Sequence, residues 1–254
     1  MAYFKRLDET TFLPTAHTGG AWNVKEQHIA PVVGLLTHML ECDCTKRAHG
    51  FVIGRLSFDI LGTLPLEPIS IEIQTLRSGR TIELIEGTVY HNQRPALRAR
   101  AWLIKPHNTH NLAGTSLLPI PPLDQMPIWE PSTIWAGDFI KSIEIRRVQH
   151  QPGRAAYWGK AKQPVLEDEQ VSALAQAACL FDIPNGMTVR ANPHEIAFPN
   201  LDVTVHLFSM PTGEWLGFDT SVSFGNNGLG VNCTILHDQH GPIGTVTQIL
   251  TIRP

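Results

Sequence analysis

Residues 24–43, VKEQHIAPVVGLLTHMLECD, are apolar around almost the whole circumference of a helix. The exceptions are His28, His38 and the charged residues at the two ends. A helix at a protein surface carries a single apolar stripe, so a helix that is apolar on nearly every side is expected to be buried. The stretch therefore predicts a long helix that the rest of the fold encloses.

Beta-like runs follow this helix and are separated by Gly, Pro and Asn turn signals. They cover residues 49–61, 67–77, 80–91 and 94–104. Short turns between successive runs favour antiparallel pairing. The first half of the chain is therefore expected to wrap a curved antiparallel sheet around its helix.

The second half repeats this order. Residues 166–183, LEDEQVSALAQAACLFDI, predict a second long helix with an acidic first turn and an Ala-rich body. The beta-like runs of this half are residues 138–148, 155–163, 201–208, 214–224, 229–238 and 243–252. The first two of these runs precede the helix and the other four follow it. Both halves thus contain a helix followed by four strands, which indicates an internal duplication of architecture.

A proline-rich stretch without periodicity lies between the two copies, which is typical of a linker or a surface crossing. We therefore expect an N-terminal unit over residues 1–105, a linker over 106–135 and a C-terminal unit over 136–254.

Composition excludes several classes of protein. A net charge of −3 and a pI near 6.4 provide no basic field for nucleic acid. The N-terminus, MAYFKRLDETTF, lacks the apolar region of a signal peptide, and the chain has no uninterrupted apolar run of about 18 residues. The four cysteines have neither disulfide-framework nor metal-knuckle spacing. We expect a cytoplasmic protein that binds no membrane, no nucleic acid and no metal.

Three segments resemble a known family. They are FLPTAHTGGAW at residues 12–22, FPNLDVTVHLFSMPTGEWLGFDTSVSFGNNGLG at 198–230, and GTVTQILTIRP at 244–254. These are similar to the TesB-type acyl-CoA thioesterases of the double-hotdog superfamily. The resemblance implies an α+β fold in which two hotdog halves share one long sheet. It also implies hydrolysis of acyl-CoA, or of an acyl-carrier thioester, without a cofactor, by a homo-oligomer, with a dimer favoured.

Gln248 breaks the pattern of its own strand, because it shares the more apolar face with Val246 and Leu250. In the family that the chain resembles, a carboxylate, a hydroxyl and a glutamine of the last strand hold the attacking water. The resemblance assigns these roles to Asp202, Ser223 and Gln248. Ser221 is an alternative to Ser223, because a bulge would exchange the two.

Each of these residues also has an ordinary structural interpretation. Asp202 alternates with apolar neighbours and fits a solvated strand face, as does Ser223. Gln248 fits a buried amide that backbone groups satisfy. If the duplicated strands are aligned, Gly54 and either Ala101 or Trp102 replace Asp202 and Gln248, so we expect one catalytic centre, in the second half.

Acyl transfer also needs donors for the oxygen that becomes negative. Backbone N–H groups at the start of a buried helix would serve, and TGGAWN at residues 18–23 is the candidate, with Gly19 and Gly20 allowing close approach. Gly19, Gly20, Ala21 and Trp22 are therefore the predicted substrate-binding residues.

Two alternative functions stay open at this stage. A hotdog hydratase or dehydratase would need a histidine base paired with an acid. His28 and His38 are available, but the sequence places no acid beside them. A non-catalytic acyl-binding scaffold would keep the fold without turnover.

Overall fold

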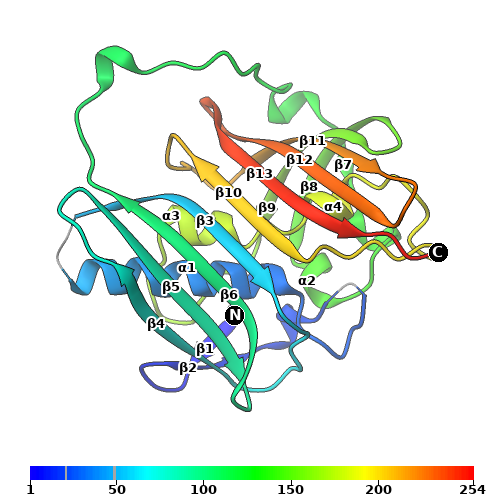
Figure 1. Cartoon of the computed structure of the whole chain (residues 1–254). Helices are drawn as coiled ribbons and strands as arrows, with labels where there is room; N and C mark the ends of the chain where they lie inside the picture. The colour runs from blue at the N-terminus through cyan, green and yellow to red at the C-terminus, as the bar shows by residue number, and fades with distance from the viewer. Residues whose placement is uncertain (21, 48–49) are drawn as a thin grey trace.

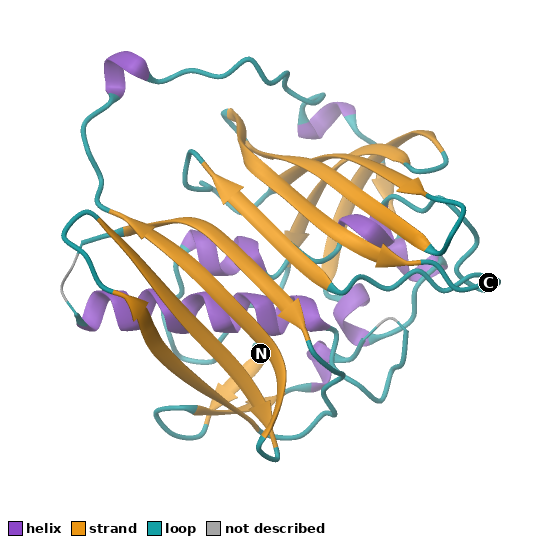
Figure 2. Ribbon diagram, in the orientation of Figure 1, coloured by secondary structure: helices purple, strands orange, loops and turns teal. Residues whose placement is uncertain are grey.

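The computed structural model describes residues 1–20, 22–47 and 50–254. Thirteen strands form one antiparallel sheet in the order β1-β2-β4-β5-β6-β3-β10-β13-β12-β11-β9-β8-β7 (Figures 1 and 2). The strands of the first half are β1 (Phe4–Arg6), β2 (Thr11–Pro14), β3 (Val52–Ile60), β4 (Ile69–Arg77), β5 (Ile82–His91) and β6 (Arg94–Ile104). Those of the second half are β7 (Ile128–Trp129), β8 (Ile143–Gln151), β9 (Arg154–Ala161), β10 (Asp202–Leu207), β11 (Leu216–Phe224), β12 (Leu229–Asp238) and β13 (Gly241–Thr251).

The two halves join at the centre of the sheet, where β3 pairs with β10. The register runs from Asp59 opposite Asp202 to Arg55 opposite His206. Order across the junction is mirrored, since β6, β5 and β4 follow β3 on one side and β13, β12 and β11 follow β10 on the other. This arrangement is the double hotdog that the sequence predicts, with one continuous antiparallel sheet.

The helix of the first half, α1 (Ile29–Lys46), is buried along most of its length. It begins five residues later than its apolar pattern suggests. Glu26 and Gln27 form isolated bridges with Pro65 and Gly19, so this segment is extended. His28 then caps the helix, because its Nδ1 accepts a hydrogen bond of 3.1 Å from the backbone N–H of Ala30.

The predicted long helix of the second half is wrong in extent. Of residues 166–183, only α3 (Ala173–Ala178) is helical, and a second short helix, α4 (Pro184–Met187), begins after them. The acidic stretch before α3 is not helical: Asp168 has a φ of 60°, and Ser172 caps α3 by accepting from the N–H of Ala175. Turns occupy residues 179–183. A separate helix then starts at Pro184, which cannot donate a backbone hydrogen bond.

Short helical segments complete the chain: η1 (Ala16–Thr18), η2 (His110–Leu112), η3 (Leu123–Gln125), η4 (Pro131–Thr133) and α2 (Asp138–Lys141). The predicted linker leaves the end of β6 and runs outside the sheet before it returns to the second half (Figure 1). Its last part contains β7, which pairs with β8. None of the helices within the described residues is long and apolar enough to cross a membrane.

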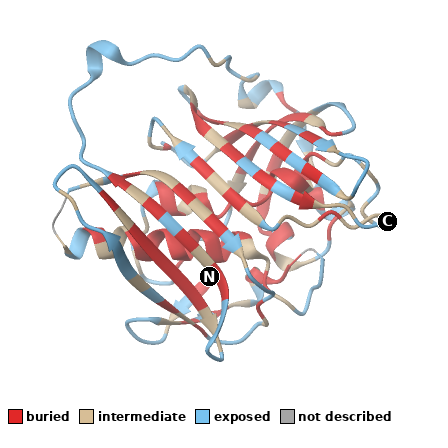
Figure 3. Cartoon of the chain, viewed as in Figure 1, coloured by how far each residue is buried: buried red, intermediate tan, exposed pale blue. Residues whose placement is uncertain are grey.

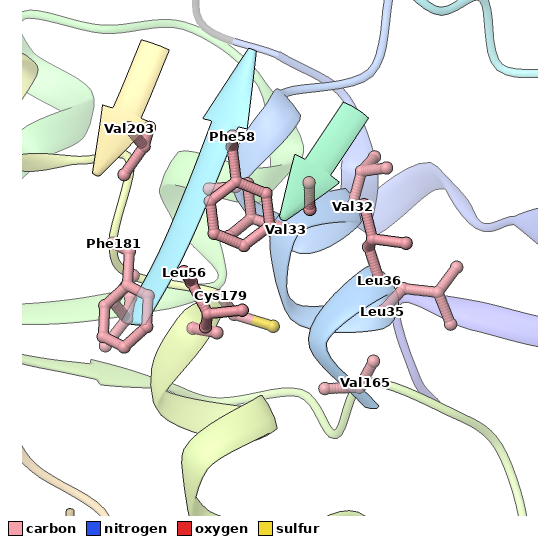
Figure 4. Close-up of a cluster of buried hydrophobic side chains, with 14 of the residues drawn as sticks. Val32, Val33, Leu35, Leu36, Leu56, Phe58, Val165, Cys179, Phe181 and Val203 are labelled. Atoms are coloured by element: carbon pink, nitrogen blue, oxygen red, sulfur yellow. The ribbon is translucent and has the colours of Figure 1, made fainter. Parts of the chain in front are cut away.

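One core unites the halves. Gly34 of α1 is packed so closely against α3 that a Cβ there would come within 2.2 Å of Cys179 Sγ. Figure 4 shows part of this core, where side chains of α1, of β3 and of the segment after α3 meet. The buried residues labelled there are Val32, Val33, Leu35, Leu36, Leu56, Phe58, Val165, Cys179, Phe181 and Val203.

Candidate active site

Asp182 lies in the turn that separates α3 from α4, and only 7% of the residue is exposed. Two carboxamides bind it. Asn200 Nδ2 donates to Asp182 Oδ1 at 2.7 Å, and Gln248 Nε2 donates to the Asp182 carbonyl at 3.1 Å and lies 3.5 Å from Oδ1. The three side chains come from the helical turn, the segment before β10, and β13, so the fold assembles them from distant parts of the second half.

A shift in strand register turns Asn200 toward this carboxylate. Within β10, Thr204 pairs with Thr247, which would place residue 200 opposite Thr251, on the outer face. Asn200 instead pairs with Leu250, one residue earlier, and Leu250 is fully buried. Such a bulge exchanges the faces of the residues on either side of it. The irregularity at Leu201 therefore brings the Asn200 amide inside.

Gln248 is 1% exposed, which confirms that it lies on the buried face of its strand. Its Oε1 has no hydrogen-bond partner among the described residues. Directly opposite on β12 lies Asn232, whose Oδ1 accepts from Thr234 Oγ1 at 2.9 Å. Within the same described residues, Asn232 Nδ2 is also unpartnered. A buried acceptor and a buried donor thus face each other across the strand pair.

Burial shifts the pKa values of both ionisable groups of the site, Asp182 and His28. Desolvation raises the pKa of Asp182 to about 6, and the hydrogen bond from Asn200 opposes this rise. Burial also lowers the pKa of His28 to about 3. Near neutral pH the site therefore contains a carboxylate that protonates easily, beside an uncharged imidazole. His28 Nδ1 lies 3.6 Å from Asp182 Oδ2.

Two adjoining pockets open onto these groups. One is lined by Trp135, Ile140, Ile183 and Met187, among other residues. The other is larger and extends past Ile60, Gly62, Thr63 and Leu64, in the connection that follows β3. Both are lined by Trp22, His28, Asp182 and Asn200. The carboxylate therefore lies between an aromatic pocket and a larger groove.

The structure does not place the side chains of Asp202 and Ser223 beside Gln248, so it does not bring the predicted three-residue centre together, and that centre stays a prediction. The neighbours of Asp202 and Ser223 along their strands, Val203 and Val222, are buried, so the two polar side chains lie on the face opposite Gln248. Asp202 Oδ1 accepts from the backbone N–H of Ile249 at 2.7 Å. The alternation of polar and apolar residues along these strands also predicts a solvated face for Asp202 and Ser223.

The predicted substrate-binding residues have mixed outcomes. Trp22 and Gly20 line the pockets, whereas Gly19 is not among the lining residues. The N–H groups of Gly19 and Gly20 donate to the carbonyls of Ala16 and Glu26, so neither is free to bind an oxyanion, and α1 begins only at Ile29. Ala21 lies outside the described residues.

Trp22 belongs to an aromatic cluster at the first pocket. Its ring centroid lies 4.8 Å from that of Trp135 and 5.5 Å from that of Phe198, both in edge-to-face geometry. Trp22 remains 49% exposed, so its ring forms a rim rather than a buried wall.

Sequence reasoning missed Asp182 and Asn200. Asp182 stands in CLFDIP, a carboxylate within an apolar segment, which is the same kind of exception that identified Gln248. Asn200 gives no such signal, because its inward orientation depends on the register shift. His28 was considered as a histidine without an adjacent acid, and the structure places Asp182 next to it.

Two hotdog halves on one sheet, with a buried carboxylate between two amides, define a double-hotdog enzyme. Family comparison specifies which kind. Residues 18–104 match the acyl-CoA thioesterase N-terminal domain, and residues 120–252 match the acyl-CoA thioesterase C-terminal domain. The chain belongs to the acyl-CoA thioesterase family and is a thioester hydrolase.

Solved structures share the fold at low identity. A hot dog fold protein from Alicyclobacillus acidocaldarius has a TM-score of 0.77 at 14% identity, covering 98% of this chain and 95% of that one. The acyl-CoA thioesterase II TesB2 of Mycobacterium marinum has a TM-score of 0.71 at 14% identity, covering 98% of this chain and 95% of that one. The tesB protein of Mycobacterium avium subs paratuberculosis has a TM-score of 0.70 at 15% identity, covering 99% of this chain and 96% of that one. No curated protein matches the chain.

Proposed function

We propose that the protein hydrolyses acyl-CoA to a free carboxylic acid and CoA, with Asp182 as the base, and Asn200 and Gln248 as the groups that hold the attacking water. One observation carries this assignment. A buried carboxylate with a pKa of about 6 is bound by two amides at the junction of two pockets. A base of this pKa is effective near neutral pH, because it is ionised and still accepts a proton.

The reaction needs no protein nucleophile. Water oxygen forms a bond to the thioester carbon while Asp182 takes one of its protons, and the carbonyl electron pair moves onto the oxygen. Collapse of the tetrahedral intermediate re-forms the carbonyl and breaks the C–S bond. The departing thiolate then takes the proton from Asp182, which restores the carboxylate. The product acid ionises in solution.

The amides complete the water site. Asn200 donates to Asp182 and so keeps the carboxylate ionised and oriented, while Gln248 Oε1, which has no partner among the described residues, can accept a hydrogen bond from the attacking water. The positive end of the α1 dipole is adjacent through His28 and favours the negative charge of the intermediate. We place the acyl group in the aromatic pocket and the pantetheine thiol in the larger groove.

The test is thiol release from a panel of acyl-CoAs by the parent, by Asp182→Asn and by Asp202→Asn. We expect turnover by the parent and by Asp202→Asn, and loss of turnover in Asp182→Asn. Equal loss in both variants, or full activity in Asp182→Asn, would contradict the assignment of the base.

A hydratase or dehydratase function is the second candidate, because His28 and Asp182 form the histidine–acid pair that such chemistry needs. Absorbance of an enoyl-CoA separates the two. Conversion of enoyl-CoA without thiol release would favour the hydratase, whereas thiol release without loss of the enoyl band supports the thioesterase.

Association into a homodimer also stays a prediction. The sheet ends at β7, for which the described residues provide pairing with β8 alone, and unpaired strand edges invite pairing with another chain. Light scattering that shows a monomer at micromolar concentration would contradict it.

A further inference from the structure

His28 has a defined tautomer. Its Nδ1 accepts a hydrogen bond of 3.1 Å from the backbone N–H of Ala30, the second residue of α1. A backbone N–H can only donate, so Nδ1 carries no proton. In a neutral imidazole the single proton then lies on Nε2. The helix cap thereby fixes which nitrogen of His28 is the donor.

That donor is left for a ligand. Among the described residues, none forms a hydrogen bond with His28 Nε2, and the nitrogen is not one of the buried unpartnered atoms. His28 lines both pockets beside Asp182 and Asn200. The ring also packs against Phe139 in a tilted arrangement, with centroids 4.4 Å apart, which restricts its rotation. A fixed N–H donor is therefore present at the junction of the two pockets.

The charge state of His28 also suits a hydrogen-bond donor. Burial keeps His28 uncharged through the neutral range, so the ring does not form a salt bridge with Asp182 that would hold both groups in an ion pair. A neutral imidazole at a helix N-terminus can act as a hydrogen-bond donor to a carbonyl, as triosephosphate isomerase illustrates. A preorganised donor of this kind stabilises charge that develops on the substrate oxygen.

We propose that the Nε2–H of His28 is a catalytic donor that binds the thioester oxygen and stabilises the oxyanion of the tetrahedral intermediate. The proposal rests on the proposed function and adds a first-half residue to a second-half base. Asp182 takes the water proton, the carbonyl electrons move onto the oxygen, and His28 donates a hydrogen bond to that oxygen without transferring its proton. When the C–S bond breaks, the electrons return and the hydrogen bond weakens.

A pair of substitutions separates the two roles of His28. The Asn side chain is short, so His28→Asn keeps an oxygen that can cap α1 and removes the distant donor. Asn is among the best capping residues. The Gln side chain reaches the position of Nε2, so His28→Gln keeps a distant N–H donor and loses the cap. If His28 only caps the helix, Asn is the harmless change; if it is an oxyanion donor, Gln is.

We expect His28→Asn to fold with nearly the parent Tm and to lose about 10²-fold or more in kcat, the usual effect of removing one oxyanion donor. His28→Gln should have a lower Tm and retain kcat within about tenfold of the parent. His38→Gln, on the same helix and away from the pockets, serves as the control. A kcat for His28→Asn within threefold of the parent would overturn the proposal.

Nitrogen NMR of the parent labelled with ¹⁵N-histidine tests the tautomer without any substitution. We expect His28 to be neutral with its proton on Nε2 at pH 7, and the Nε2 resonance to shift when a ketone analogue of acyl-CoA binds. A proton on Nδ1, or no shift, would overturn the proposal even if a variant failed to fold. If the parent itself released no thiol, the proposed function would fail instead, which is a distinguishable outcome.

Discussion

The interiors of the two halves differ in polarity. Facing α1, the central strands of the first half present apolar side chains and glycine: Leu56, Phe58, Ile85, Gly87, Val89, Leu97, Ala99 and Ala101. The corresponding inner face of the second half carries a row of polar groups: Arg147, Tyr157, Thr220, Thr234, Asn232 and Gln248. In the first half, the buried Glu83 shares the inner face of β5 and pairs with Arg47, which follows α1. The same architecture therefore encloses a mostly apolar core in one half and a row of polar groups in the other.

Hydrogen bonds connect three members of the polar row, Thr220, Thr234 and Asn232. Thr220 and Thr234 share a hydroxyl contact of 2.9 Å, and Thr234 donates to Asn232, which lies opposite Gln248. The row thus ends at the carboxamide that binds Asp182. Burial of polar groups costs free energy unless hydrogen-bond partners satisfy them. The second half therefore has a smaller apolar core than the first, and it contains polar groups in a defined arrangement.

The helices differ in the same way. The helix α1 is continuous over 18 residues, whereas the second half has helices of six and four residues with turns between them. The interruption places Asp182 outside a regular helix, where its carbonyl is free to accept from Gln248. A continuous helix would have used that carbonyl for an internal hydrogen bond.

The comparison is tested most strongly by Asp182→Asn. Replacement of the base is expected to lower kcat by about 10³-fold, within the usual range for general-base catalysis. The folded pKa of Asp182 lies above its unfolded value, so its relative contribution to stability is present below pH 4 and is lost as the pH rises through about 6. At pH 8 the neutral amide removes a cost of roughly 3 kcal/mol, and Tm should rise.

Calorimetry and thiol release on the same preparation check both parts. The control is Asp202→Asn, an outer-face carboxylate of the same half, which should leave kcat within twofold. A fall in Tm for Asp182→Asn at pH 8 would contradict the charge-burial argument.

Gln248→Leu probes the polar row at the end that binds Asp182. We expect kcat to fall about 10²-fold, because one water-positioning contact is lost in the transition state, while the analogue-binding constant stays close to that of the parent. Steady-state kinetics and titration with a non-hydrolysable acyl-CoA analogue measure the two. Similar kcat values for parent and variant would show that Gln248 is only a buried structural amide.

The pH dependence follows from Asp182. Since the base must be ionised, kcat/KM should fall about tenfold for each pH unit below about 6 and be constant above it. His28 should add no second inflection between pH 5 and 8, because its pKa is about 3. A pH–rate profile from pH 4.5 to 8.5 checks this, and an acid limb centred near pH 4 would be the contrary result.

Asn232→Val gives the smallest effect and asks whether the rest of the row matters. We expect a threefold to tenfold loss of kcat, since the Gln248 amide loses the neighbour that restricts its orientation, with KM unchanged. Val has a strand-compatible side chain of similar size, so Tm should change little. Thiol release with saturating acyl-CoA measures it, and a loss as large as that of Gln248→Leu would make Asn232 part of the water site itself.

The fold was predictable from sequence because its signals are local. A helix that is apolar on nearly all sides must be enclosed, and strand alternation gave the faces of β10 to β13, as the pattern of buried and exposed residues in Figure 3 shows. The limits of the second helix were not predictable from its Ala-rich composition, since the N-cap at Ser172 and the break before Pro184 override it.

The burial of Gln248 was predictable from sequence alone because an amide among apolar residues contradicts the alternation of its own strand, and burial is the property that alternation encodes. Asp182, Asn200 and the tautomer of His28 were decided by tertiary structure. Asp182 needs the helix break, Asn200 needs a one-residue register shift against β13, and His28 needs the start of α1 at Ile29. Sequence periodicity specifies which face a residue occupies, whereas a catalytic site depends on which faces meet, and only the packed chain determines that.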